Sequence, residues 1–189
     1  PRFGFNSFVA ELASKSLVFH YGTQQSHSSW PYPNRDSALT AQKYCHREYS
    51  DCSSDIKDFL GIPCLIVNKK STPSAKAFWQ HTGLGLSSRE AAIALGREKA
   101  PSISVGHCAR DELLNRLAKI YNCDRNLIRL HRSGMAALTA ILSAIQCLKG
   151  SSYSLQIGFP YVDVLKLPQV IFQGGDLIIK TKLSHIKEE

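Results

Sequence analysis

The chain has 189 residues, of which 43% are hydrophobic and 20% are charged, the composition of a folded globular protein. Its 23 Lys and Arg against 15 Asp and Glu give a formal charge of +8. The basic residues are scattered and carry no aromatic-interleaved RNA-binding motif, so a basic solvated surface is favoured over nucleic-acid binding. No apolar run is long enough to cross a bilayer and no signal peptide is visible, so the default expectation is a cytoplasmic protein without a membrane partner.

Six cysteines are expected to be reduced thiols rather than disulfides or metal ligands. None of them forms a C-x-x-C pair, and no secretory context accompanies them. Cys45–His46 and His107–Cys108 could each offer two ligands, but the two pairs lie far apart in the sequence. Metal sites usually need ligand pairs at short fixed spacing, so we expect no metal.

The first elements are predicted from hydrophobic spacing. Apolar residues at helical intervals predict a helix within 3–20, and the Ser- and Pro-rich segment 21–37 predicts a loop. A second helix is expected over 38–49, with Asp36 or Ser37 as its cap.

The middle of the chain begins with a β-branched, apolar segment, 62–70, that predicts a strand. Gly83 and Gly85 indicate a loop, and Ser87 or Ser88 can cap a helix that follows it. The clearest amphipathic helix is then 109–121, which places leucines and an isoleucine on one face.

The second half of the chain alternates between strand and helix. A strand at 125–131, a helix at 134–148 and a strand at 153–159 would form one βαβ unit. Another helix begins at 161–167, Gly174–Gly175 interrupts it, and 176–183 would form a further strand. This alternation predicts an α/β fold with a mainly parallel sheet and flanking helices.

The stretch Ser133-Gly134-Met135 opens the helix directly after His131 and Arg132. The first-turn N–H groups of a helix have no internal partners and the helix dipole favours an anion, so a phosphate could bind there. An ordinary serine cap with an incidental glycine is the simpler interpretation, and it is preferred from these residues alone.

Tyr161 favours the phosphate interpretation. It follows the next strand, so in a parallel sheet it would lie at the same rim as Ser133. An aromatic ring there could stack on a planar group while the helix amides hold its phosphate, although it could equally pack over the sheet edge. Pyridoxal phosphate is a cofactor that joins a flat ring to a phosphate.

Several segments resemble the cystathionine γ-synthase family, specifically its fungal-type, pyridoxal-phosphate-dependent trans-sulfuration enzymes of Cys and Met metabolism. They are SGMAALTAI, GFPYVDVLKL, AKAFWQHTGLGLSSREA and WPYPNRDSALTAQKYC. The resemblance implies a fold type I, aspartate aminotransferase-like large domain. It divides the chain into an N-terminal region, 1–90, and the incomplete first half of the cofactor domain, 91–189. Small amino-acid substrates and a homo-oligomer, or association with a complete subunit, are implied as well.

The resemblance also assigns roles to residues. Gly134 and Met135 would hold the phosphate through their amides, with Ser133 at the turn, and Tyr161 would stack on the ring. Arg89 would match an arginine that reaches the phosphate in a neighbouring subunit, a task that suits its planar fork.

Three departures leave an alternative open. Ser87 replaces a tyrosine of many relatives, and Pro168 should kink or end the helix after Tyr161. The lysines at 180, 182 and 187 follow no recognisable Schiff-base motif, so the catalytic residues are unknown and the chain alone is expected to be inactive. The alternative is a non-catalytic paralogue, or a partner subunit of a pyridoxal phosphate enzyme.

Overall fold

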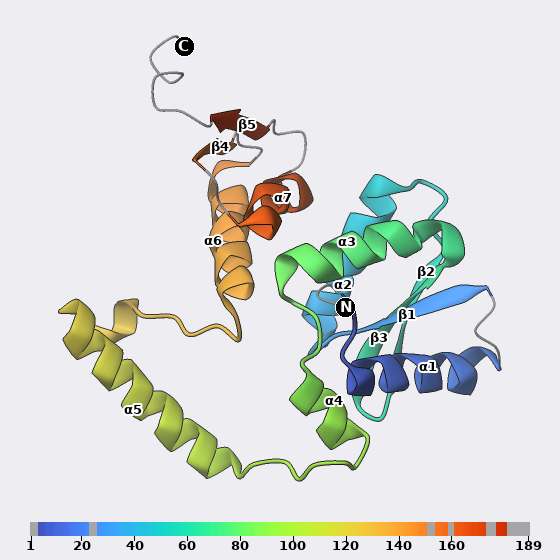
Figure 1. Ribbon diagram of the computed structural model, residues 1–189, viewed down its shortest axis with the longest axis horizontal. Coiled ribbons are helices and arrows are strands. Elements are labelled where there is room, and N and C mark those ends of the chain that lie inside the picture. Colours follow the sequence, from blue (N-terminus) through green and yellow to red (C-terminus); the bar gives the residue numbers. More distant parts are fainter. Residues whose placement is uncertain (1–3, 23–25, 151–153, 159–160, 173–176, 181–189) are drawn as a thin grey trace.

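The computed structural model describes residues 4–22, 26–150, 154–158 and 161–172, together with the backbone of 177–180 (Figure 1). In chain order its elements are α1 (Ser7–Tyr21), β1 (His27–Pro31), α2 (Arg35–Glu48), β2 (Ser54–Phe59), β3 (Ile62–Asn68), η1 (Lys69–Ser71), α3 (Thr72–Thr82), α4 (Ser88–Ala94), α5 (Ile103–Tyr121), η2 (Arg125–Leu127), α6 (Gly134–Lys149), β4 (Ser154–Ile157), α7 (Val162–Ile171) and β5 (Leu177–Lys180). The α/β class is confirmed.

The larger sheet is antiparallel, in the order β1-β3-β2. The expectation of a mainly parallel sheet is therefore wrong. Strands β2 and β3 form a hairpin through Leu60 and Gly61, whose φ angles are +51° and +74°. Two consecutive positive φ values are typical of the tight turn whose twist matches an antiparallel pair, and such a pair needs no helical crossover. Among the described strands, only β4 and β5 are parallel.

Both faces of the central strand β3 are covered by helices. Leu65 and Val67 pack in a cluster with residues of α2 and α3, whereas Cys64 packs with residues of α1 and α4. Successive side chains of a strand point to opposite faces, so the buried residues of β3 pack alternately into the cores on the two sides of the sheet. The continuous apolar sequence of 62–67 has this cause, and the strand predicted at 62–70 is confirmed over Ile62–Asn68.

Strand β1 lies where the sequence predicts a loop, so that prediction is wrong. The segment looks irregular because of its serines and prolines, but two of its serines pair with helices. Ser29 Oγ lies 2.7 Å from Ser16 Oγ of α1, and Ser28 Oγ lies 2.8 Å from Thr72 Oγ1. Pro31 ends an edge strand, where its missing N–H is tolerated.

The N-terminus of α2 also differs from the expectation. Asn34, rather than Asp36 or Ser37, caps the helix, and its Oδ1 accepts a hydrogen bond of 2.9 Å from the Ser37 amide. Asparagine and aspartate are both strong caps, so adjacent candidates cannot be separated by residue type alone.

No strand forms at 125–131, and the βαβ unit predicted around it is wrong. Asp124 instead caps the short helix η2, and the Arg125 guanidinium donates to Asp111 at 2.7 Å and to Asn115 at 3.0 Å. The parallel unit that does form is β4-α7-β5, one step further along the chain. Gly174–Gly175, and residues 176 and 181–183 of the last predicted strand, lie outside the described residues.

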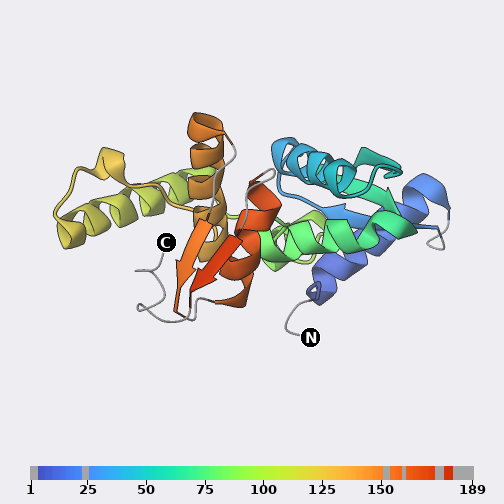
Figure 2. The same ribbon diagram turned by 90° about the horizontal axis from the view of Figure 1, so that it is seen from above.

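Helix α5 contains the amphipathic helix predicted at 109–121, and begins six residues earlier. It packs mainly against η2 and extends away from the three-stranded sheet in both views (Figure 2). Leu114 is buried, but Leu113 and Ile120 are 46% and 72% exposed. The apolar face that the sequence identifies is therefore largely uncovered by the described residues.

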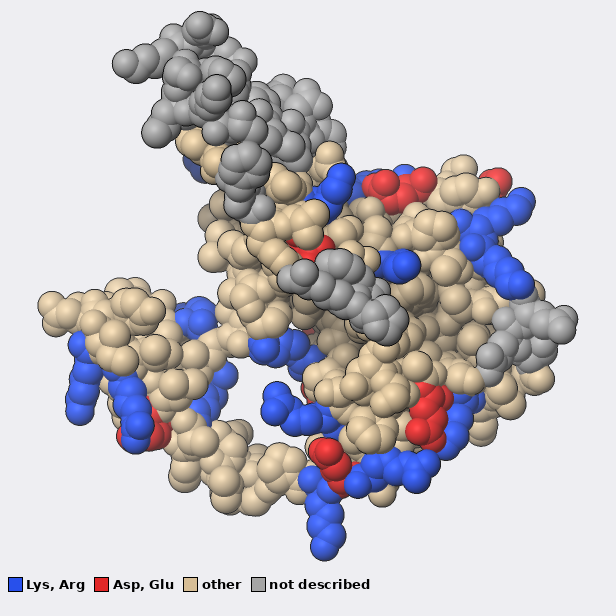
Figure 3. Space-filling view, in the orientation of Figure 1, with Lys and Arg blue, Asp and Glu red and all other residues tan. Residues whose placement is uncertain are grey.

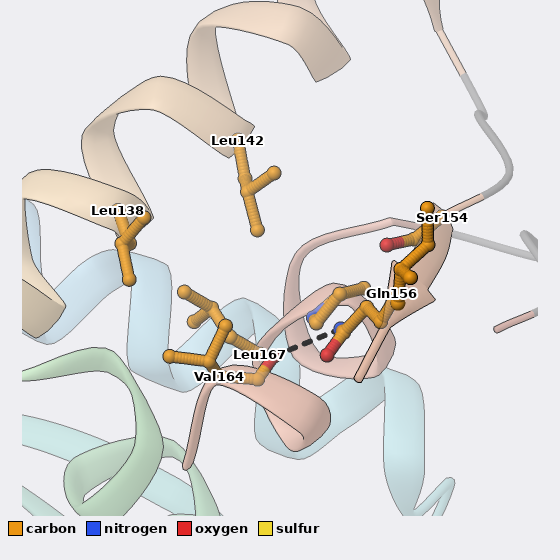
Figure 4. Close-up of a pocket in the computed structure, with 8 residues that line it drawn as sticks. Leu138, Leu142, Ser154, Gln156, Val164 and Leu167 are labelled. Atoms are coloured by element: carbon orange, nitrogen blue, oxygen red, sulfur yellow. Dashed lines mark hydrogen bonds between the residues drawn. The ribbon is translucent and has the colours of Figure 1, made fainter. Parts of the chain in front are cut away.

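Helices α6 and α7 enclose an apolar hollow of about 230 Å³ with β4 (Figure 4).

The sequence predicts that Pro168 kinks or ends α7. The helix does not end there, because it continues to Ile171. A proline cannot donate to the carbonyl four residues earlier. The oxygen concerned, that of Val164, accepts a hydrogen bond from the Gln156 side chain instead.

The face seen in Figure 3 carries Lys and Arg at several separate places, interspersed with Asp and Glu. No helix among the described residues is both long enough and apolar enough to cross a membrane.

Candidate functional site

The candidate site begins at the first turn of α6. Ser133 has extended backbone angles, and its Oγ accepts a hydrogen bond of 3.1 Å from the Ala136 amide. This is the serine cap of the simpler interpretation, and the helix predicted at 134–148 with a stop at Gly150 is confirmed. The amides of Gly134 and Met135 form no hydrogen bond with any described residue. The turn therefore keeps two donors that an anion could use.

A polar hollow of about 210 Å³ lies at this turn. Its lining includes Arg132, His131 and Ala136 from the α6 side, and Asn34 and Ser37 from the start of α2. The positive ends of two helix dipoles thus meet at one hollow, beside a guanidinium and an imidazole. The charge of the hollow suits an anion better than a neutral ligand.

Glu90 partly neutralises this charge. Arg132 donates to both oxygens of the Glu90 carboxylate, at 2.9 and 3.0 Å, and Glu90 also forms a capping box with Ser87. Burial opposes ionisation of Glu90, but the hydrogen bonds from Ser87 and the Arg132 guanidinium outweigh it and hold the pKa of this carboxyl below its ordinary value. Arg132 is consequently held in place as an ion-pair partner at the rim.

Gly83 explains how the turn is positioned. It ends α3 with a φ of +66°, and a Cβ there would lie 2.8 Å from Ser133 Oγ and 2.9 Å from both the Ala136 amide and Met135 Cβ. A Cβ at Gly134 would meet nothing within 4 Å. Packing therefore requires glycine at 83 but not at 134, where the space next to the backbone is open among the described residues.

Two further contacts fix α6 and α7 against α3. Thr139 Oγ1 donates to the Thr82 carbonyl at 2.7 Å, and His81 Nδ1 lies 2.8 Å from the buried Asp163 Oδ1. Both contacts use the C-terminal turn of α3, which also ends at Gly83. The C-terminal turn of α3 thus holds both α6 and α7, and Gly83 after it lies against the first turn of α6.

The remaining predicted site residues lie on other helices. Arg89 is exposed in the first turn of α4 and makes no hydrogen bond or ion pair with the described residues. Tyr161 is the N-cap of α7 and is 49% exposed. Ser133, Gly134 and Met135 are thus together in one turn, while the phosphate role of Arg89 and the stacking role of Tyr161 stay predictions.

Sequence reasoning missed Asn34, Gly83 and Glu90 as parts of this region. The two glycines at 83 and 85 indicated a loop, but not that one of them contacts α6. Ser87 and Glu90 have the S-x-x-E spacing of a capping box, a signal that was available. The pairing of Glu90 with Arg132 depends on tertiary structure and has no local signal.

No group of three or more His, Cys, Asp or Glu side chains that could hold a metal ion occurs in the described part of the chain. Comparison with known proteins identified no matching family model, no similar curated protein and no similar solved structure.

Proposed function

We propose that the chain carries the phosphate-holding part of a pyridoxal-phosphate-dependent trans-sulfuration enzyme of the cystathionine γ-synthase type. Such an enzyme would join an activated homoserine ester to cysteine, giving cystathionine for methionine biosynthesis. The observation that carries the proposal is the first turn of α6. The amides of Gly134 and Met135 have no partner among the described residues, and Ala136 of the same turn lines a polar hollow with His131 and Arg132. The fold type I architecture belongs to the same proposal, and β4-α7-β5 is the parallel unit that supports it.

In this proposal the first turn of α6 binds and orients the phosphate. The amides of Gly134 and Met135 donate to its oxygens, and the dipole of α6 stabilises its charge. Tyr161 would stack on the ring and Arg89 would contact the phosphate in a neighbouring subunit. When bound, pyridoxal phosphate supplies an electron sink for negative charge on the substrate carbon. No lysine of the chain is assigned the covalent role.

The proposal is tested by removing one amide without removing the helix. Proline is tolerated at the first helical position, and the extended conformation of Ser133 suits a residue before proline. Gly134→Pro should therefore keep α6 while deleting one donor to the phosphate. A hydrogen bond to a charged group contributes about 1.5–3 kcal/mol, so pyridoxal phosphate should bind roughly tenfold more weakly or worse in equilibrium dialysis.

Gly134→Ala is the matched control, because it keeps the amide and a Cβ there meets open space. Its affinity should be close to that of the unchanged chain. If the unchanged chain does not bind pyridoxal phosphate, or if Gly134→Pro binds it equally well, the proposal is wrong.

A second candidate function is a non-catalytic partner subunit. The exposed apolar residues Leu113, Ile120 and Tyr121 on α5 favour it, because such a face is usually covered in a working assembly. Borohydride reduction with pyridoxal phosphate, followed by mass spectrometry, separates the two functions. A label on one lysine would support catalysis, and binding without any label would support the partner subunit.

A further inference from the structure

A second hollow, of about 340 Å³, lies between the exposed faces of α2 and α6. Lys43, Tyr44 and Arg47 line it from α2, and Gln146 and Cys147 line it from α6. These α6 residues belong to the C-terminal half of the helix, whereas the phosphate turn is at its N-terminus. The hollow is thus separate from the candidate site and is within the usual range of small-molecule pockets, about 300–1,000 Å³.

The charged residues among the described lining of this hollow are Lys43 and Arg47, both positive. Arg47 is held in place by hydrogen bonds of 3.1 and 3.0 Å to the carbonyls of Gln169 and Val170, and by an ion pair with Glu48. Lys43 makes no hydrogen bond or ion pair with the described residues. No Asp or Glu is among the described residues that line the hollow, although Glu48 lies next to Arg47 and Tyr44, so an anionic group would meet an available ammonium on the Lys43 side.

Two neutral polar groups complete the polar side of the hollow. The Gln146 Oε1 atom is buried and has no hydrogen-bond partner among the described residues. Such an atom is costly to leave unpaired, so it favours a ligand with an N–H group, towards which the Gln146 side chain must turn because the atom is closed to solvent in the unbound chain. Burial raises the pKa of Tyr44 to about 12, and the phenol therefore stays protonated and can donate to an anion at neutral pH.

The floor of the hollow is apolar. Phe78 of α3 and Val170 of α7 are buried there, and the rings of Tyr44 and Phe78 lie 5.6 Å apart at an angle of 43°. A planar or branched apolar group could occupy this floor and gain from burial. A ligand that matches this hollow therefore has an anionic group, an N–H donor and an apolar body.

We propose that this hollow binds a small carboxylate of the N-acylated apolar amino acid class. The carboxylate pairs with Lys43 and the Tyr44 hydroxyl, the amide N–H donates to Gln146, and the side chain lies on Phe78 and Val170. An acylated amine fits better than a free one, because an ammonium group would meet Lys43 and Arg47 with no acid among the described lining residues.

Cys147 provides the measurement. Its thiol lines the hollow and is exposed, while Cys108 and Cys123 are exposed and lie outside it. The full chain is treated with iodoacetamide at increasing concentrations of N-acetyl-L-phenylalanine, and alkylation of each cysteine is followed by mass spectrometry. We expect Cys147 to be alkylated at least threefold more slowly at saturation, with Cys108 and Cys123 unchanged. N-acetyl-L-phenylalaninamide, which has no carboxylate, should not protect Cys147 at the same concentrations.

Two variants test the roles of the lining residues. Lys43→Gln should raise the half-protecting concentration about tenfold, and Gln146→Glu, which places a negative charge beside the ligand, should do the same. Lys119→Gln on α5 removes an equal charge far from the hollow and should change nothing. The proposal is overturned if no protection occurs, if all three cysteines are protected equally, or if Lys43→Gln and Lys119→Gln behave alike.

Discussion

The side-chain amide of Gln156 donates a hydrogen bond of 3.0 Å to the carbonyl oxygen of Val164, which Pro168 leaves without its helical donor. Figure 4 shows Gln156 reaching from β4 towards α7 for this contact. The Gln156 side chain on β4 thus supplies the hydrogen bond that Pro168 cannot donate within α7. The contact also links the first strand of the β4-α7-β5 unit to its crossover helix.

The contribution of this hydrogen bond to the free energy of unfolding can be measured by a double-mutant cycle. Gln156→Leu should lower the free energy of unfolding by about 1–2 kcal/mol, because the Val164 oxygen loses its donor. In a Pro168→Ala background the alanine amide can supply the helical bond, so the same change should cost at least about 0.5 kcal/mol less. Urea unfolding of the four proteins gives the coupling. Equal costs in both backgrounds would mean that Gln156 does not compensate for the proline.

The hydrogen bonds from Ser87, together with the ion pair to Arg132, lower the pKa of Glu90 and predict a pH dependence. The pKa of Glu90 is lower in the folded chain than in the unfolded chain, so its contribution is complete above the unfolded value, about 4.3, and is lost as the pH falls through the folded value. Glu90→Gln keeps a residue suited to the capping box but removes the charge. The stability gap between the two proteins should be present at pH 6–7 and should close below pH 4. A gap that is independent of pH in urea unfolding would argue against the ion pair.

Gly83 and Gly134 form a contrasting pair. Gly83→Ala should lower the free energy of unfolding by about 2 kcal/mol or more, because φ is +66° and the new Cβ would press on the backbone of α6. Gly134→Ala should be neutral or should stabilise by up to about 1 kcal/mol, since alanine favours the helix. Thermal unfolding of both variants checks this order. The reverse order would mean that α3 does not pack against the first turn of α6.

The cysteines should divide into two groups under alkylation. Burial raises the pKa of Cys45 to about 12 and that of Cys64 to about 11, so these thiols hold almost no reactive thiolate at pH 8. Cys52 is buried as well. Mass spectrometry after brief iodoacetamide treatment should find label at Cys108, Cys123 and Cys147 only. Rapid labelling of Cys45 or Cys64 in the folded chain would contradict the core described here.

The sequence predicted elements well where the signal is local. The helices α1, α5 and α6 follow from apolar spacing, and Gly22, Asn122 and Gly150 cap their C-terminal ends. Strand β1 was missed because its stability comes from pairing with β3 and from Ser29 meeting Ser16, which are separated along the chain. The opposite error occurred at 125–131, where a strand-like sequence has no neighbouring strand among the described residues.

The candidate site shows the same division. The cap at Ser133 and the two helical positions after it could be predicted, because capping is a property of consecutive residues. The partners of the turn could not: Gly83 reaches it from α3, and Glu90 reaches Arg132 from α4. Both contacts depend on how the helices pack, and neither contact produces a repeat or a fixed residue spacing in the sequence that could predict it.

The alternation along β3 has a consequence for the hairpin that precedes it. Cys64 faces α1 and α4, whereas Leu65 faces α2 and α3, so shifting the strand by one residue would exchange the side chains offered to the two layers. Leu60 and Gly61 set that alignment through a turn of fixed length. The positive φ angles of Leu60 and Gly61 restrict which residues fit this turn, and a change of its length that shifted β3 by one residue would present each core with the side chains of the other.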